Sequence, residues 1–131
     1  MVGLLIVAHS ASLAAGVREL AAQVSDQRVP IGVAGGDLEG GLGISVDQIV
    51  QELQRIGSIA LPEGILILTD LKGAVLSVEA ALELVDQLPY EISDAPLVEG
   101  AYLAAIEASV GGTLAEVAAA ALQARDMHKR S

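Results

Sequence analysis

Two short runs of consecutive apolar residues mark the most buried strands of this chain. The first covers residues 2–7 and the second covers residues 65–68, and neither alternates between apolar and polar positions. Such runs are typical of strands in a parallel sheet that is covered on both faces. A chemically reactive side chain lies two positions after each run, His9 beyond Ala8 and Asp70 beyond Thr69. We therefore expect these two residues at the carboxyl ends of buried strands.

Apolar residues at helical spacing occur both between the two runs and after the second one. A first helix is expected directly after His9, with Ser10 or Ser12 as its N-cap. A second helix is expected from Ser45, because Ser45 and Gln48 have the spacing of a capping box. The apolar face predicted for the first helix consists of Leu13, Val17, Leu20, Ala21 and Val24. Later helices are expected over residues 75–88, around 102–110 and from Thr113 onward.

Two further strands have weaker signals. Residues 29–34 read as a strand near the edge of the sheet, because Pro30 cannot donate a ladder hydrogen bond. Residues 92–98 read as a last, more exposed strand that is interrupted by polar residues. The glycine-rich segment 35–43 has no periodicity, and its glycines would allow the backbone to approach a phosphate closely. It lacks the lysine and hydroxyl residues of a P-loop, so a flexible loop without chemistry is the alternative.

The order of these elements is β-α-β-α-β-α-β-α-α, which predicts a doubly wound α/β fold. We expect a mainly parallel four-stranded sheet of order 2-1-3-4 with helices on both faces. In that order the first and third strands are neighbours at the switch point, where open α/β sheets bind ligands, so His9 and Asp70 should lie side by side. A single domain over residues 1–125 is expected, followed by a C-terminal tail over 126–131.

Composition narrows the classes of function. The formal net charge is −10, with 17 acidic and 7 basic residues. This charge would repel nucleic acid and anionic lipid, and it favours a partner with a basic surface. The chain has no cysteine, which excludes disulfides and thiolate ligands. No apolar run approaches the roughly 18 residues of a membrane helix, so we expect a cytoplasmic protein. No cofactor is expected. A metal site built from His9, Asp37 and Asp70 is not expected either, because no ligand pair has a diagnostic spacing.

A histidine beside a carboxylate at the start of a helix suggests phosphoryl transfer. The carboxylate would hold one ring nitrogen and leave the other as an unprotonated nucleophile. The amides of the helix N-terminus would attract an anion. The alternative is a loop-end histidine with no chemistry. A receiver-like switch phosphorylated on Asp70 would need an acidic pair for Mg²⁺ at the first strand end, where this chain has His9 and Ser10.

Three segments carry a resemblance to a known family: residues 6–20 (IVAHSASLAAGVREL), residues 66–85 (LILTDLKGAVLSVEAALELV) and residues 94–105 (DAPLVEGAYLAA). Together they resemble the DhaM-type phosphotransferase subunit of the phosphoenolpyruvate-dependent dihydroxyacetone kinase, which has the fold of mannose-type enzyme IIA domains. The match extends over about residues 2–118. Members of this family are typically homodimers.

The resemblance implies a phosphohistidine carrier, and hence a phosphotransferase. His9 would accept phosphate from the phosphocarrier protein HPr and pass it to ADP held by the kinase subunit, and Asp70 would orient His9. The residues expected to bind the phosphate are Ser10, Ser12, Gly43, Ser45, Lys72 and Gly73.

The chain departs from the usual family pattern in two places. The residues after Asp70 are usually Gly-Ser-Ala, and here they include Lys72, Gly73 and Ala74. Ile44 replaces a customary hydroxyl residue. An enzyme IIA domain of a mannose-type sugar transport system is an alternative, against which the string at residues 95–100 (APLVEG) argues. A non-catalytic interaction module is the other alternative.

Overall fold

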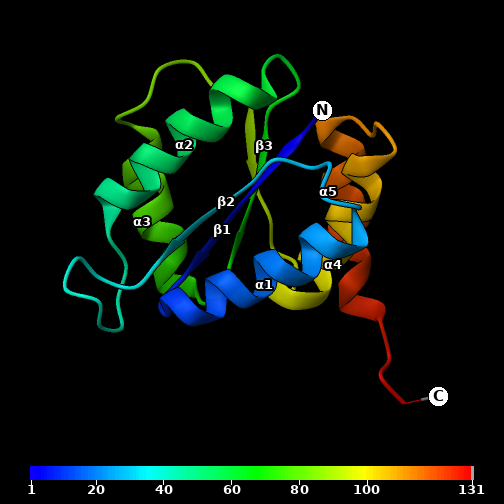
Figure 1. Ribbon diagram of the computed structural model, residues 1–131, viewed down its shortest axis with the longest axis horizontal. Coiled ribbons are helices and arrows are strands. Elements are labelled where there is room, and N and C mark those ends of the chain that lie inside the picture. Colours follow the sequence, from blue (N-terminus) through cyan, green and yellow to red (C-terminus); the bar gives the residue numbers. More distant parts are fainter. Residues whose placement is uncertain (131) are drawn as a thin grey trace.

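A four-stranded parallel sheet is the centre of the fold (Figure 1). A computed structural model describes residues 1–130 of the chain. The strand order is β2-β1-β3-β4 and every neighbouring pair is parallel, as the sequence predicts. The strands are β1 (Gly3–Ala8), β2 (Ile31–Gly35), β3 (Ile65–Thr69) and β4 (Tyr90–Ile92).

Helices cover both faces of this sheet. Figure 1 shows α2 and α3 on one face and α1, α4 and α5 on the other. The helices are α1 (Ala11–Val24), α2 (Val46–Ala60), α3 (Lys72–Leu82), α4 (Leu97–Ser109) and α5 (Leu114–Leu122), followed by the short 3-10 helix η1 (Gln123–Asp126). The predicted α/β class and its doubly wound arrangement are confirmed.

Strand β1 contributes side chains to two separate hydrophobic cores. Leu4 and Ile6 pack on the side of α1, α4 and α5, and Leu5 and Val7 pack on the side of α2 and α3. All four side chains are fully buried. Burial of one such side chain stabilises the fold by about 1.5–3 kcal/mol, which explains why the strand carries no polar position.

The two cores differ in the size of the side chains that the helices bring. Helices α4 and α5 contribute mostly alanines, which are Ala101, Ala104, Ala105, Ala108, Ala118 and Ala121. Helix α2 instead contributes Ile49, Leu53 and Ile56. A β-carbon at Gly100 would lie only 2.8 Å from the Ala95 β-carbon and 3.2 Å from Leu68 Cδ2. Small residues therefore let α4 approach the sheet closely.

The outer edge of β2 is closed by a side chain. The amide of Val33 donates a hydrogen bond of 3.0 Å to Oε1 of Glu52, and Arg55 donates two hydrogen bonds to the same carboxylate. The hydrogen bonds from Arg55 and Val33 outweigh the effect of burial and lower the pKa of Glu52. Unpaired backbone N–H and C=O groups at a sheet edge attract other strands, so this contact protects the edge strand. Pro30 had indicated that this strand lies at an edge.

The capping predictions agree with the structure. Ser10 caps α1 by accepting a hydrogen bond from the Leu13 amide, and Ser45 caps α2 in the same way from the Gln48 amide. Thr113 forms a complete capping box with α5. Polar residues at these three positions therefore determine where the helices begin.

The predicted apolar face of α1 is wrong in part. The helix buries Ala14, Val17 and Ala21, whereas Leu13 and Leu20 are 41% and 40% exposed. The reason is a close approach to β2, since a β-carbon at Gly35 would lie 3.0 Å from that of Ala14. Only small side chains fit there, and the leucines project from the sides of the helix.

The region of the last strand also needs correction. Strand β4 covers Tyr90–Ile92 instead of residues 92–98, and α3 ends at Leu82 well before residue 88. Beyond β4 the hydroxyl of Ser93 accepts a hydrogen bond from the Ala95 amide, which turns the chain. Helix α4 then begins directly after Pro96, so it starts earlier than the sequence indicates.

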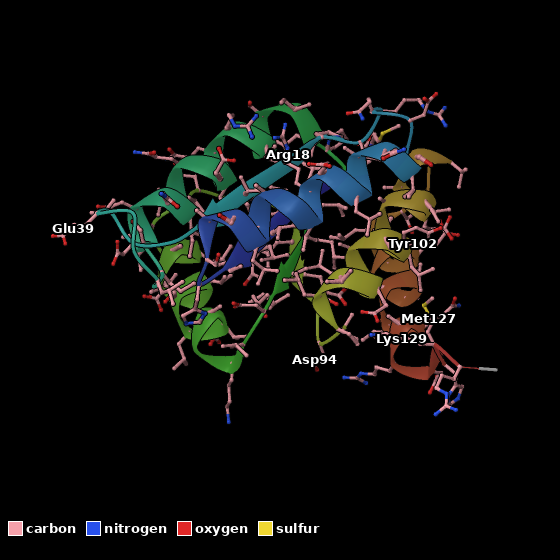
Figure 2. All side chains as sticks on the ribbon, turned by 60° about the horizontal axis from the view of Figure 1, so that its bottom comes forward. Arg18, Glu39, Asp94, Tyr102, Met127 and Lys129 are labelled. Atoms are coloured by element: carbon pink, nitrogen blue, oxygen red, sulfur yellow. The ribbon has the colours of Figure 1, made fainter. Side chains whose placement is uncertain are left out.

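Side chains from the segment after η1 lie close to α4. Lys129 forms an ion pair of 3.1 Å with Glu99, and both Lys129 and Met127 lie beside η1 in Figure 2. Helix η1 (Gln123–Asp126) spans the predicted boundary between residues 125 and 126, which stays a prediction. Ser131, the last residue of the predicted tail, lies outside the described residues. None of the helices in residues 1–130 combines the length and hydropathy needed to cross a membrane.

Candidate active site

His9 and Asp70 meet at the carboxyl edge of the sheet, as the strand order predicts. Strands β1 and β3 pair in parallel with Val7 opposite Thr69, so the residues that follow them emerge next to each other. Nδ1 of His9 lies 3.1 Å from Oδ1 and 3.2 Å from Oδ2 of Asp70. The His9 amide also donates a hydrogen bond of 2.9 Å to Oδ2 of Asp70. The carboxylate therefore holds both the ring and the backbone of the histidine.

Asp70 remains ionised in this setting. Burial by itself raises the pKa of Asp70, but the hydrogen bonds from His9 and from the Leu71 amide, the latter 2.7 Å long, outweigh burial and lower it. An ionised carboxylate only accepts hydrogen bonds, so the tautomer of His9 that pairs with Asp70 carries its proton on Nδ1. Nε2 then keeps a free lone pair.

Nε2 of His9 lies beside the beginning of α3. A β-carbon at Gly73 would be 3.8 Å from this nitrogen, and the His9 side chain is 34% exposed. The N-cap residue of α3, Leu71, provides no side-chain hydrogen bond to the first turn. Free amides at a helix N-terminus favour an anion, so a group bound to Nε2 would lie next to them.

The other predicted phosphate-binding residues occupy different places around His9. Ser10 is the N-cap of α1, and Ser12 is exposed in the first turn of that helix. The hydroxyl of Ser45 is nearly buried and caps α2. Lys72 is the exposed first residue of α3, and among residues 1–130 its ammonium group forms no ion pair.

Gly43 contacts the histidine through the backbone. Its amide donates a hydrogen bond of 2.8 Å to the carbonyl of His9. The segment that carries Gly43 is held by hydrogen bonds within the loop. Asp37 lies at its centre and accepts hydrogen bonds on Oδ1 from the amides of Glu39 and Gly41, at 2.9 Å and 2.8 Å.

Sequence reasoning missed this role of Asp37. The available signal was an aspartate at the start of a glycine-rich segment, a residue type whose side chain commonly bonds backbone amides two or more positions ahead. The Asp37 carboxylate is engaged within its own loop. In the part of the chain that the structure describes, no three His, Asp or Glu side chains are arranged to hold a metal ion.

Two hollows lie at this edge of the sheet. One of about 460 Å³ is lined by Asp70, Lys72 and Leu76 together with Ser93 and Asp94. The other, of about 470 Å³, is lined by the loop residues 37–39 and the first turn of α2. Both hollows are open to solvent, and the His9 side chain is not enclosed.

The chain combines a parallel α/β sheet with a histidine and a carboxylate at the switch point of that sheet. Comparison with known proteins gives its family. The chain belongs to the family described as the PTS system fructose IIA component, whose model matches residues 3–118. The resemblance to DhaM-type subunits is confirmed by relatives of that name. The phosphoryl donor subunit DhaM of the PEP-dependent dihydroxyacetone kinase 2 of Listeria innocua is 36% identical over 84% of this chain and 88% of that protein.

Longer relatives match as well. The phosphoryl donor subunit DhaM of Providencia stuartii is 40% identical over 95% of this chain, and the match spans 27% of that protein. Among solved structures, the protein EF1359 of unknown function is 32% identical with a TM-score of 0.81, over 93% of each chain. A sigma-54 interaction domain protein from Enterococcus faecalis, at 18% identity and a TM-score of 0.73, shares the fold.

Proposed function

We propose that this chain is a phosphohistidine carrier that accepts a phosphoryl group on Nε2 of His9 and passes it to an acceptor. The observation that carries the proposal is the hydrogen bonding of Nδ1 to the ionised Asp70, which leaves Nε2 as a nucleophile beside the start of α3. The relatives from Listeria innocua and Providencia stuartii are named as phosphoryl donor subunits, which supports this role.

The accepting step forms one bond and breaks another. The lone pair of Nε2 attacks the phosphorus of a phosphorylated donor, and the bond between phosphorus and the donor group breaks. Nδ1 keeps its proton, so the phosphorylated ring of His9 is positively charged. The Asp70 carboxylate stabilises that charge through the hydrogen bond at Nδ1. The first amides of α3 stabilise the phosphoryl oxygens.

The donor in this proposal is HPr, and the acceptor is ADP on the nucleotide-binding subunit of a dihydroxyacetone kinase. In the second step a terminal phosphate oxygen of ADP attacks phosphorus, and the lone pair returns to Nε2. The chain would thus be one subunit of a phosphoenolpyruvate-glycerone phosphotransferase. It acts as a homodimer in the cytoplasm, where phosphoenolpyruvate and ADP are available.

A second candidate is an enzyme IIA domain that passes phosphate to a sugar transporter. The description of the matching family as a fructose IIA component favours it. The two functions share the accepting step on His9 and differ in the acceptor. The two functions are distinguished by giving the phosphorylated chain either ADP with the kinase subunit or a sugar-specific transport component, and measuring which of them removes the phosphate.

The test of the accepting step uses the whole chain with phosphoenolpyruvate, enzyme I and HPr. We expect one phosphate per chain, labile to acid and stable to base, as is typical of phosphohistidine. Adding ADP and the kinase subunit should then discharge it. Absence of label, or an acid-stable phosphate, would contradict the proposal.

Lys72 provides a more specific prediction. Its neighbour Gly73 lies beside Nε2. We therefore expect the flexible Lys72 side chain to bring its ammonium group to a phosphoryl oxygen on His9. A charge-assisted hydrogen bond there would stabilise the phosphorylated form. Replacing Lys72 by serine should shorten the lifetime of the phosphohistidine or shift the equilibrium towards the donor.

The matched control is Lys129→Ser, which removes the same charge from the end of the chain. Lifetime is measured by the decay of label after the donor is removed, and the equilibrium by the labelled fraction at varied donor ratios. If the Lys72 and Lys129 variants behave alike, Lys72 is a surface residue without a role in the site.

A further inference from the structure

The backbone of His9 is held at both of its polar groups. Its amide donates to Asp70, and its carbonyl accepts from the Gly43 amide at 2.8 Å. The first contact comes from the turn after β3, and the second comes from the loop between β2 and α2. The position of the histidine ring therefore depends on both segments.

The two ends of the loop that carries Gly43 are anchored, because Gly36 and Ile44 form a bridge and Ile44 packs against the core, but the tip of the loop has few contacts outside itself. Residues 38–42 include two glycines, and the large side chains of Leu38 and Leu42 are 73% and 80% exposed. Glycine loses more conformational freedom on ordering than any other residue. A loop of this composition needs a specific contact to keep one conformation.

Asp37 provides that contact. Its Oδ1 accepts from the amides of Glu39 and Gly41, its own amide donates to the Gly41 carbonyl at 2.9 Å, and its carbonyl accepts from Gly40 at 3.2 Å. The Asp37 side chain also packs against Gly43, where an added β-carbon would lie 3.3 Å from the Asp37 β-carbon. The loop is thus wrapped around one carboxylate.

We infer that Asp37 is a positioning residue for phosphoryl transfer, which holds the Gly43 amide on the His9 carbonyl and thereby keeps Nε2 in place. This inference rests on the proposed function. Asp37 acts as a hydrogen-bond acceptor, and its negative charge is not required. Asparagine can make both hydrogen bonds through its side-chain carbonyl, whereas alanine makes neither.

The test compares three variants of the whole chain: Asp37→Ala, Asp37→Asn and Glu39→Ala. Glu39→Ala is the matched control, because this substitution removes the same negative charge from the same loop. Figure 2 shows the Glu39 side chain at the outer tip of the loop, pointing away from the sheet. The readouts are the rate of phosphorylation by phosphorylated HPr, hydrogen exchange of the Gly43 amide, the ¹⁵N shifts of the His9 ring, and thermal unfolding.

Asp37→Ala should lower the rate of phosphorylation by about 10- to 100-fold, as loss of a group that supports a reactive one commonly does. It should also speed exchange of the Gly43 amide and shift the His9 ring signals. Asp37→Asn and Glu39→Ala should match the wild type in all three measurements, and the melting temperature of Asp37→Ala should stay near that of Glu39→Ala.

A slow Asp37→Asn variant would show that charge matters, and would overturn the inference. So would an Asp37→Ala variant with normal Gly43 exchange, or one whose slow transfer only accompanies general destabilisation. If the wild type accepts no phosphate at all, the proposed function fails, and the exchange and ring signals still decide whether Asp37 positions His9.

Discussion

Replacing His9 by alanine is expected to abolish phosphoryl acceptance while the chain still folds. The ring supplies the attacking Nε2, and no other described side chain lies in an equivalent position beside Asp70. The side chain is one-third exposed at a strand end, so its removal leaves no large cavity. By comparison, truncation of a fully buried residue such as Leu5 commonly costs about 2–5 kcal/mol.

The chain offers a matched control for this experiment. It has two histidines, and the second, His128, is exposed beyond η1. His128→Ala should accept phosphate at the wild-type rate. Labelling with the phosphoenolpyruvate system measures acceptance, and circular dichroism during thermal unfolding measures stability. Equal labelling of the His9 variant and the wild type would place the phosphate elsewhere and refute the central proposal.

Replacing Asp70 by asparagine should keep the nucleophile but slow transfer by about 100-fold, the upper end of the effect that loss of an orienting group commonly has. The neutral amide no longer requires a proton on Nδ1, so part of the population has Nε2 protonated and unreactive. The amide also fails to stabilise the positive ring of the phosphorylated form. Single-turnover phosphorylation measures the rate, and an unchanged rate would show that the carboxylate does not act on His9.

Asp70→Asn should also change how the free energy of unfolding depends on pH. The folded-state pKa of Asp70 lies below its ordinary value of 3.8, so the ionised carboxylate stabilises the folded state at pH values above 3.8. This contribution is lost as the pH falls through the lowered folded-state pKa. Asp70→Asn lacks it, so the free energy of unfolding of the variant should fall less steeply on acidification. Urea denaturation at a series of acidic pH values measures the difference.

The two buried strands could be predicted from local patterns, and the order of the sheet from the usual topology of doubly wound folds. Strand β1 is buried on both faces, so every position is apolar and the strand is visible as a continuous run. Its neighbour β3 has the same character except at Thr69, where the strand ends. Once the order of the sheet is known, parallel pairing alone brings the two residues after these strands together.

Other parts depended on contacts that no local pattern records. The buried face of α1 was mispredicted because the space beside β2 admits Ala14 and excludes leucine. Strand β4 has three residues, and its Tyr90 and Glu91 are exposed, so its apolar signal is minimal. The role of Asp37 depends on hydrogen bonds within a loop that has no periodic pattern. Hydrophobic periodicity therefore could not predict this role.

The alanines of α4 and α5 imply that the two sides of the sheet differ in mutational tolerance. Where alanine and glycine meet the sheet closely, an added methyl group must displace backbone, so enlargement at Ala104 or Gly100 should be costly and truncation has little left to remove. Where Ile49 and Leu53 fill the opposite core, truncation opens a cavity. As such proteins diverge, Gly100 and the buried alanines of α4 are therefore constrained by an upper limit on side-chain volume, and Ile49 and Leu53 of α2 by a lower limit.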